Sequence, residues 1–203
     1  MRFNIFRVIF AVVITVSMVA LVTCSALYTD KKQTQIEQKL LSSCENVVED
    51  ESEITVKISA MDQLKYFGGT FTEQELAEQV ILLFGNDMCE LSESPQYPEE
   101  FLLHFTGKNY RLCKKICVEK IFADLDLLKE EKRDFSCKYN ENLSVFNMHL
   151  VDFNDNLLEN DTANDILWYC FFFQKFQNKN TEDFTVFKEY DGNSKSSIEI
   201  QER

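Results

Sequence analysis

The chain has 203 residues, and its 34 acidic residues outnumber its 21 lysines and arginines, which gives a formal net charge of −13. A field of this sign repels nucleic acid and anionic membrane surfaces, so both are excluded as partners, whereas it favours solubility and attracts basic partners. Only five glycines and two prolines occur. Because sheets and sandwiches need turn residues at short intervals, the composition predicts an all-α fold.

The N-terminal segment has the order of regions found in secretory signal peptides. Arg2 and Arg7 precede an uncharged run over 8–23, and small residues follow the run. We expect cleavage after Ala26, with a cut after Cys24 as the alternative, and hence a secreted, extracellular protein. A further alternative is a type II membrane protein that keeps the segment as its anchor, although the run is shorter than the ~20 residues that a spanning helix needs.

Removal of residues 1–26 would leave a length that suits one domain with a sizeable core. We predict a helical, disulfide-containing domain over 27–190, with a candidate joint between subdomains near 90–98. The C-terminal residues GNSKSSIEIQER are polar and predict a disordered tail over 191–203.

In the first half of this domain, apolar residues recur at helical spacing. They predict helices over 32–49, 54–67 and 72–85. The alternation Ile54-Val56-Ile58 in the second of these would also suit a short strand. The third carries the clearest signal, because Thr72 and Glu75 form a capping box at its start.

The second half of the domain follows a polar loop over 90–98. Helical spacing predicts further helices over 99–107, 109–131, 143–153 and 164–176. The last of them is apolar on more than one face, which predicts a central, buried helix. The segment 184–190 alternates weakly. The whole pattern predicts a disulfide-stapled, all-α bundle of about six to seven helices.

Seven cysteines occur, and Cys24 would leave with the signal peptide. An even number then remains in a chain sent to an oxidising compartment, where disulfides form and persist. The candidates for three disulfides are Cys44, Cys89, Cys113, Cys117, Cys137 and Cys170. Six cysteines can pair in fifteen ways, and the sequence does not choose among them.

Cys113 and Cys117 lie four residues apart in the predicted helix 109–131. Side chains at this spacing point in parallel and do not converge to the short Cβ separation of a disulfide. Each is therefore expected to pair with a different segment, which makes this helix the hub of the bundle. The alternative is a pair of buried free thiols in a helix seam.

Two N-glycosylation sequons occur, Asn142-Leu143-Ser144 and Asn160-Asp161-Thr162. We expect both in loops, at the two ends of the predicted helix 143–153. In a secreted chain they predict glycans on Asn142 and Asn160, which would keep that surface exposed.

The sequence contains no nucleophile elbow, glycine-rich phosphate loop or H-E-x-x-H motif, and its only histidines are His104 and His149. A segment from Asp152 resembles a calcium loop, but Leu157 and Ala163 stand where the loop needs Gly and Glu. We therefore predict no catalytic residue, no metal and no cofactor, and a protein that is not an enzyme. A secreted hydrolase is the less favoured alternative.

Eighteen phenylalanines suit either a packed core or an apolar ligand pocket. The spacing Cys89-x23-Cys113-x3-Cys117 is similar to that of the first three cysteines of insect odorant-binding proteins, which are helical secreted carriers, but the later cysteines depart from that pattern. We predict a secreted binding protein whose partner is an unknown protein. The alternative is a carrier of a small apolar ligand, with the phenylalanines at 171–173 as a pocket wall.

Overall fold

The structure is a computed structural model that describes residues 30–45, 49–67, 69–97, 99–131, 135–143, 145–151, 157–177, 184–191 and 195–202. The chain divides into two units, Met1–Lys39 and Leu40–Arg203, whereas the sequence places a candidate joint near 90–98. A helix covers residues 30–44 and overlaps the predicted helix 32–49. The predicted signal peptide, residues 1–26, lies outside the described residues.

The unit Leu40–Arg203 combines helices with two antiparallel sheets, so the prediction of an all-α, disulfide-stapled bundle is wrong. All six of its cysteines carry free thiols in this structure. After the helix that ends at residue 44, its elements are β1 (Glu53–Ile58), α2 (Ala60–Phe67), α3 (Glu73–Phe84), β2 (Glu90–Glu93), β3 (Phe101–Thr106), α4 (Gly107–Glu131), β4 (Phe135–Tyr139), β5 (Phe146–Val151), α5 (Leu157–Phe176), β6 (Phe184–Asp191) and β7 (Lys195–Glu202).

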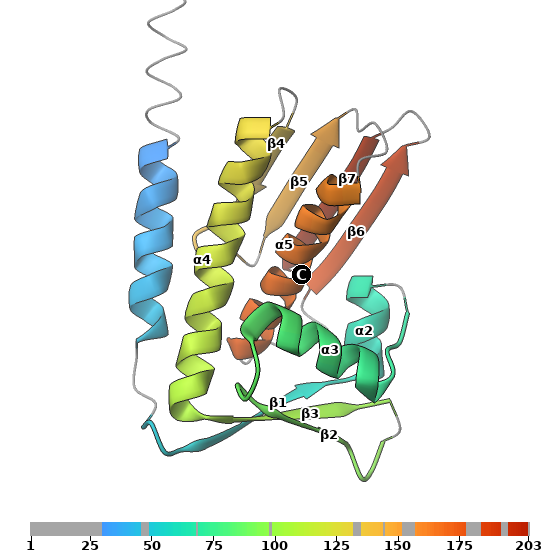
Figure 1. Cartoon of the computed structure of the whole chain (residues 1–203). Coiled ribbons are helices and arrows are strands. Elements are labelled where there is room, and N and C mark those ends of the chain that lie inside the picture. The colour runs from blue at the N-terminus through green and yellow to red at the C-terminus, as the bar shows by residue number, and fades with distance from the viewer. Residues whose placement is uncertain are drawn as a thin grey trace, which may run out of the picture. The chain divides into compact units, whose positions relative to one another are not determined.

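The first sheet has three strands in the order β1-β3-β2, and β3 is antiparallel to both neighbours (Figure 1). Phe101, Leu103 and Phe105 of β3 are buried, whereas the residues between them are exposed or half-buried. A period of two marks a strand with one covered face. The predicted helix 99–107 is therefore a strand, and the predicted helix 54–67 is β1 followed by α2.

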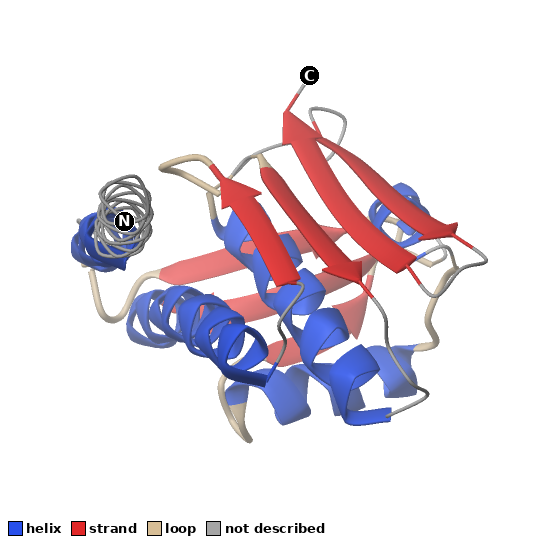
Figure 2. Cartoon of the chain, turned by 90° about the horizontal axis from the view of Figure 1, so that it is seen from above, coloured by secondary structure: helices blue, strands red, loops and turns tan. Residues whose placement is uncertain are grey.

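The second sheet has four strands in the order β4-β5-β7-β6 (Figure 2). β7 is an inner strand, because it pairs with β5 on one side and with β6 on the other. It lies within the range 191–203, for which the sequence predicts a disordered tail. β5 takes the place of the predicted helix 143–153, and its pairing of Phe146 with Ile200 joins segments that are distant in the sequence.

The helices predicted over 72–85 and 109–131 are confirmed as α3 and α4, and the helix predicted over 164–176 is the second part of α5. α3 begins with a complete capping box. The Glu75 amide donates to the Thr72 hydroxyl at 3.3 Å, and the Thr72 amide donates to the Glu75 carboxylate at 2.8 Å. Of the described helices, none is long and apolar enough to cross a membrane.

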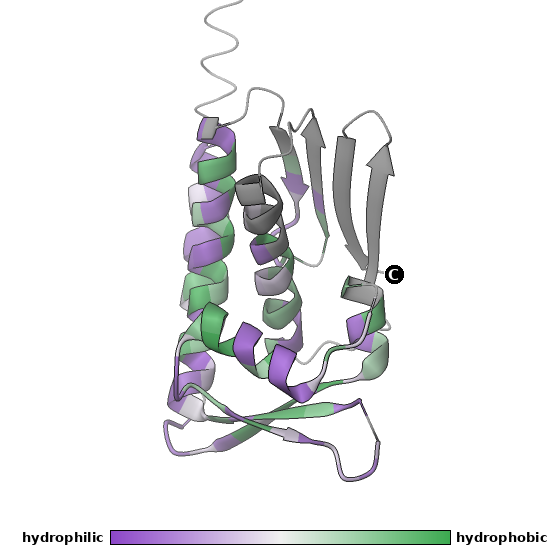
Figure 3. Cartoon of the chain, turned by 45° about the vertical axis from the view of Figure 1, so that its right-hand side comes forward, coloured by the Kyte–Doolittle hydropathy of each residue, from purple (hydrophilic) through white to green (hydrophobic). Residues whose placement is uncertain are grey.

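α5 packs against α4 and crosses one face of the second sheet (Figures 1 and 2). The side chains of its second half form an aromatic core. Figure 3 shows hydrophobic residues along this half of α5. The Trp168 ring stacks on Phe67 of α2 with centroids 3.8 Å apart and on Phe172 with centroids 5.8 Å apart. Phe84 of α3 meets Phe172 edge-on at 5.1 Å. The aromatic residues of α5 therefore join the helices into one core.

Candidate functional site

The outer face of the sheet β1-β3-β2 is mostly polar, because every second residue of its strands points away from the core. It also carries Leu102 and, opposite it, Lys57, whose ammonium group is paired with Glu100. The register places Thr55 of β1 and Glu90 of β2 directly opposite His104 of β3. Glu53 lies opposite Thr106 at the next position on the same face. Directly opposite residues share a face of a sheet. Hydroxyls, carboxylates and an imidazole therefore lie together on this surface.

His104 is held between two hydroxyl groups. Its Nδ1 atom lies 3.1 Å from Thr55 Oγ1, and its Nε2 atom lies 3.1 Å from Ser92 Oγ. A neutral imidazole donates from one nitrogen and accepts at the other, and hydroxyls can serve either role, so both tautomers are satisfied. A Ser–His contact occurs in hydrolases, but there a carboxylate orients the far ring nitrogen, and here that nitrogen meets a hydroxyl. The two hydroxyls fix the imidazole without completing a catalytic triad.

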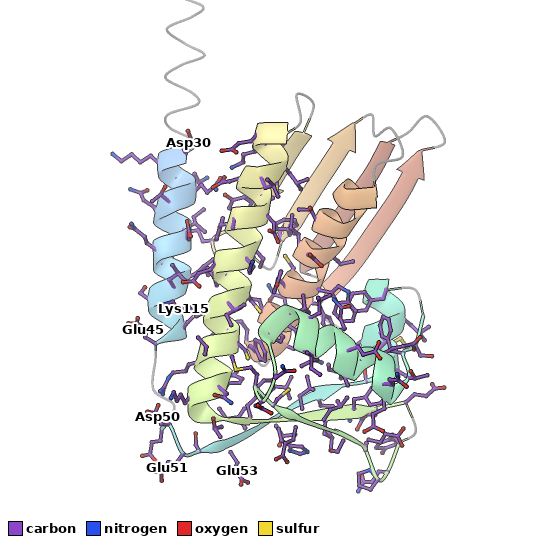
Figure 4. All side chains as sticks on the ribbon, in the orientation of Figure 1. Asp30, Glu45, Asp50, Glu51, Glu53 and Lys115 are labelled. Carbon is purple, nitrogen blue, oxygen red and sulfur yellow. The ribbon has the colours of Figure 1, made fainter. Side chains whose placement is uncertain are left out.

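A groove of about 570 Å³ opens beside His104, between the sheet, the loop before β2 and the start of α4. Its carboxylates come from Glu53, Asp87 and Glu90, which are all exposed. None of its described lining residues is a lysine or an arginine. Figure 4 shows Glu53, the first residue of β1, pointing away from the helices, with Glu51 in the turn that precedes the strand. The groove therefore presents negative charge to solvent.

The loop that supplies Asp87 is fixed to the start of α4. The side-chain amide of Asn109 donates to the carbonyl of Asp87 at 3.2 Å and to the carbonyl of Met88 at 3.0 Å. Asp87 itself has a φ of 63°, a left-handed conformation that Asp tolerates better than most residues. These contacts set the position of one wall of the groove.

Cys89 lines the same groove, but its thiol is not an activated nucleophile. Burial raises the pKa of Cys89 to about 11. The reactive form of cysteine is the thiolate, and catalytic cysteines have a lowered pKa. The raised pKa favours the protonated thiol of Cys89 at neutral pH.

A second groove, of about 460 Å³, lies between α3 and α5 and is lined in part by Leu82 and Trp168. The side chain of Leu82 is 73% exposed. The run Phe171, Phe172 and Phe173, which the sequence suggests as a pocket wall, lines neither groove. All three of its rings are fully buried and fill the core.

The six predicted disulfide cysteines are spread over the helices and strands, and they do not form one surface site. Cys44 lies at the end of the helix 30–44, Cys89 precedes β2 and lines the acidic groove, and Cys137 lies in β4. The remaining three are fully buried in α4 and α5, namely Cys113, Cys117 and Cys170.

The two predicted glycosylation residues lie in different settings. Asn142 is exposed in the turn between β4 and β5, as expected for a loop. Asn160 lies in the first turn of α5, whereas the sequence predicts a loop there. The turn that carries Asn142 is fixed to α5, because the buried amide of Gln174 donates to the carbonyl of Leu143 at 2.6 Å.

No metal site accompanies the groove, since the described residues contain no group of three or more His, Cys, Asp or Glu residues that could hold an ion. The two histidines lie in different sheets, His104 in β3 and His149 in β5.

Sequence reasoning missed the groove residues Glu53, Asp87 and Glu90. Apolar and polar residues alternate in β1 and β3, which indicates strands. This signal could have placed two walls of the groove side by side.

No protein-family model, curated protein or solved structure matches this chain. Function resides in a site and not in a fold, so the charge, the hydrogen-bonding groups and the shape of the groove are the features that bear on it.

Proposed function

We propose that this chain is a secreted binding protein that holds a positively charged segment of another protein in the groove beside His104. One observation carries the proposal: three carboxylates line the groove, and its described lining residues include no lysine or arginine. Complementary charge steers partners toward a surface and fixes their orientation on it. The net charge of −13 would add to this steering over a longer range.

The hydrogen-bonding groups of the groove suit a lysine or arginine side chain. Ammonium and guanidinium groups are donors only, and they need acceptors. Glu53 of β1 lies opposite Thr106, and Glu90 of β2 lies opposite His104, so the two glutamates flank β3 on the face that carries His104. Hydrogen bonds between charged groups are about twice as strong as neutral ones. A basic side chain laid across β3 would meet acceptors from both neighbouring strands.

The burial of the aromatic residues in the core favours a protein partner over a small apolar ligand. Phe171, Phe172 and Phe173 pack against other rings and have no exposed surface. A carrier needs an apolar pocket with a few polar groups, whereas the groove beside His104 is open and acidic. We retain secretion and glycosylation at Asn142 and Asn160 as parts of the proposal, supported by the N-terminal segment and the two sequons.

The proposal is tested by calorimetric titration of the full chain, as secreted from eukaryotic cells, with a capped peptide of alternating lysine and glycine. Glu90→Gln removes one carboxylate opposite His104, so we expect about a fivefold loss of affinity, equivalent to about 1 kcal/mol. Raising the salt concentration should weaken binding to the unaltered protein.

Glu130→Gln is the matched control, because it makes the same chemical change near the far end of α4. Glu130 is exposed and lies 21 positions along the helix from Asn109, a distance of roughly 30 Å. It should change the affinity less than twofold. Equal losses for Glu90→Gln and Glu130→Gln would mean that the peptide responds only to net charge, and the proposed site would be wrong.

A further inference from the structure

α3 carries acidic and apolar residues on a side that the core does not cover. Glu75, Glu78 and Leu82 follow one another at spacings of three and four residues, so they share one side of the helix. None of the three is among the residues that α3 buries, and the side chain of Leu82 is 73% exposed. An exposed apolar surface with a polar rim is typical of interaction sites.

These three residues form one wall of the groove of about 460 Å³ between α3 and α5, which we call the α3–α5 groove. Trp168 of α5 also lines it, and the centroid of its ring lies 5.3 Å from that of Phe71, a further lining residue. The hydroxyl of Tyr169, the next residue of α5, donates to the carbonyl of Leu83 at 3.4 Å. This bond fixes α3 to α5, so the groove is already formed before a partner binds.

The two carboxylates of the wall are held in place by hydrogen bonds. Glu75 Oε2 accepts from the amide of Thr72 at 2.8 Å and from its hydroxyl at 2.9 Å, and these bonds lower the pKa of Glu75. Glu78 Oε1 accepts from the side-chain amide of Gln74 at 2.8 Å. The segment 71–84 contains no lysine or arginine, and neither occurs among the described residues that line the groove. The wall therefore presents fixed negative charge beside an apolar surface.

We propose that the α3–α5 groove is a second docking surface, and that its occupant is a basic amphipathic helix of a partner protein. Apolar side chains on one face of that helix would cover Leu82 and Trp168, while lysines or arginines beside them would meet the carboxylates of Glu75 and Glu78. Amphipathic helices bind in apolar grooves in this way, and complementary charge fixes their orientation. The α3–α5 groove shares no lining residue with the groove beside His104, so the inference does not depend on the function proposed there.

The spacing along α3 favours a helix as the occupant. Glu75 and Leu82 lie seven positions apart on α3, which corresponds to about 10 Å along the helix axis. Side chains seven positions apart on a partner helix have the same separation and lie on the same side of that helix. A helix laid along α3 would therefore place a basic side chain beside Glu75 and an apolar one beside Leu82.

The charge of the chain argues against a second copy as the occupant. The formal net charge is −13, and α3 contains three glutamates and no basic residue. Two copies that met through α3 would bring like charges together, which opposes association. A basic partner gains from the same charges.

The fluorescence of Trp168 reports on this groove, because Trp168 is the only tryptophan of the chain. The full chain is titrated with a capped peptide of about 18 residues, built of alanine, leucine and lysine, whose leucines and lysines lie on separate faces of a helix. We expect a saturable change in emission. A peptide of the same composition in scrambled order should bind at least about fivefold more weakly, since its leucines do not share one face.

Variants of α3 locate the binding. Leu82→Ser removes the most exposed apolar side chain of the groove and should weaken binding of the amphipathic peptide about tenfold. Ile81→Ser is the matched control, because Ile81 is the adjacent residue, is 49% exposed and does not line the groove. It should change the affinity less than about twofold. Glu78→Gln should weaken binding about threefold, and added salt should reduce that difference.

The two grooves are tested by different peptides and different variants. Glu90→Gln lies outside the α3–α5 groove and should leave the affinity for the amphipathic peptide unchanged within about twofold. If the lysine–glycine peptide fails to bind while the amphipathic peptide binds as expected, the proposed function fails and this inference stands.

Four outcomes would overturn the inference. They are the absence of a saturable change in emission, equal binding of the scrambled peptide, equal losses for Leu82→Ser and Ile81→Ser, and a dimer of the chain in sedimentation that Leu82→Ser dissociates. The last would mean that the groove holds a second copy. Because the side chain of Leu82 is mostly exposed, Leu82→Ser should fold, and urea denaturation checks this.

Discussion

Asp124 is a half-buried carboxyl group on α4, close to Asp165 of α5. Burial raises the pKa of Asp124 to about 6, Lys120 acts in the opposite direction, and Asp165 raises the pKa further. Tyr169 lies in the same region, and its pKa is raised by burial and then by the two aspartates. The interface of α4 and α5 thus contains a carboxyl group that favours its neutral form.

This carboxyl group predicts a pH dependence of stability. Because its pKa in the folded protein lies above the unfolded value of about 4, the neutral form contributes stability below pH ~4, and that contribution is lost as the pH rises through about 6. Asp124→Asn should therefore raise the free energy of unfolding at pH 7 by about 1 to 2 kcal/mol, after allowance for solvent screening.

Urea denaturation at pH 5 and pH 7 measures this effect. The gain from Asp124→Asn should be larger at pH 7 than at pH 5. Asp126→Asn changes an exposed carboxylate on the same helix and should shift stability by less than about 0.5 kcal/mol at either pH. A loss of stability in the Asp124 variant at pH 7 would contradict the account.

At the scale of elements, an ion pair joins α5 to α2. Lys175 Nζ lies 2.7 Å from Asp62 Oδ2, and both side chains are almost wholly removed from solvent. Asp62 also accepts from the Ser59 amide at 2.8 Å, at the start of α2. A buried charge that loses its partner remains desolvated and uncompensated. This pair therefore ties the short helix α2 to the core.

Replacement of one partner tests that role. Lys175→Met keeps much of the volume and removes the charge, so it should lower the free energy of unfolding by about 3 kcal/mol. Lys115→Met is the control, because Lys115 forms an exposed pair with Glu119 at 3.7 Å and should cost less than about 0.5 kcal/mol. Chemical denaturation that gave equal changes for the two variants would show that the buried pair has no special role.

The sequence predicts some elements correctly because their signals are local. The capping box of Thr72 and Glu75 and the long apolar stripe of α4 depend only on neighbours in the chain, and both helices are confirmed. For β3 the sequence predicts a helix, because its apolar residues also fit a short helical stripe. Its identity as a strand depends on pairing with β1, whose residues lie about fifty positions away.

At the scale of the whole molecule, the scarcity of glycine is misleading. Tight turns often use glycine because a positive φ is strained for other residues. This chain adopts positive φ values with Asp87 at 63°, Glu99 at 68° and Leu143 at 55°. Two of the three are held by neighbours: Asn109 binds the carbonyl of Asp87, and Gln63 binds the carbonyl of Glu99 at 2.9 Å. Composition alone therefore does not exclude sheets.

The candidate groove follows from this topology. Its carboxylates come from segments near residues 53, 87 and 90, and its imidazole comes from residue 104. Only the sheet order β1-β3-β2 brings them together. The net charge predicts solubility and an attraction to basic partners, whereas the position of the candidate groove depends on long-range strand pairing that no local pattern shows.

The most direct test of the central claim is a map of backbone amide NMR shifts as the capped lysine–glycine peptide is added to the isotopically labelled secreted protein. If the acidic groove is the binding site, the saturable shifts should concentrate at residues 53–55, 87–92 and 104–109, and Glu90→Gln should reduce them. Saturable shifts confined to other surfaces, or small changes spread evenly over the exposed carboxylates, would contradict the claim that this groove is the binding site.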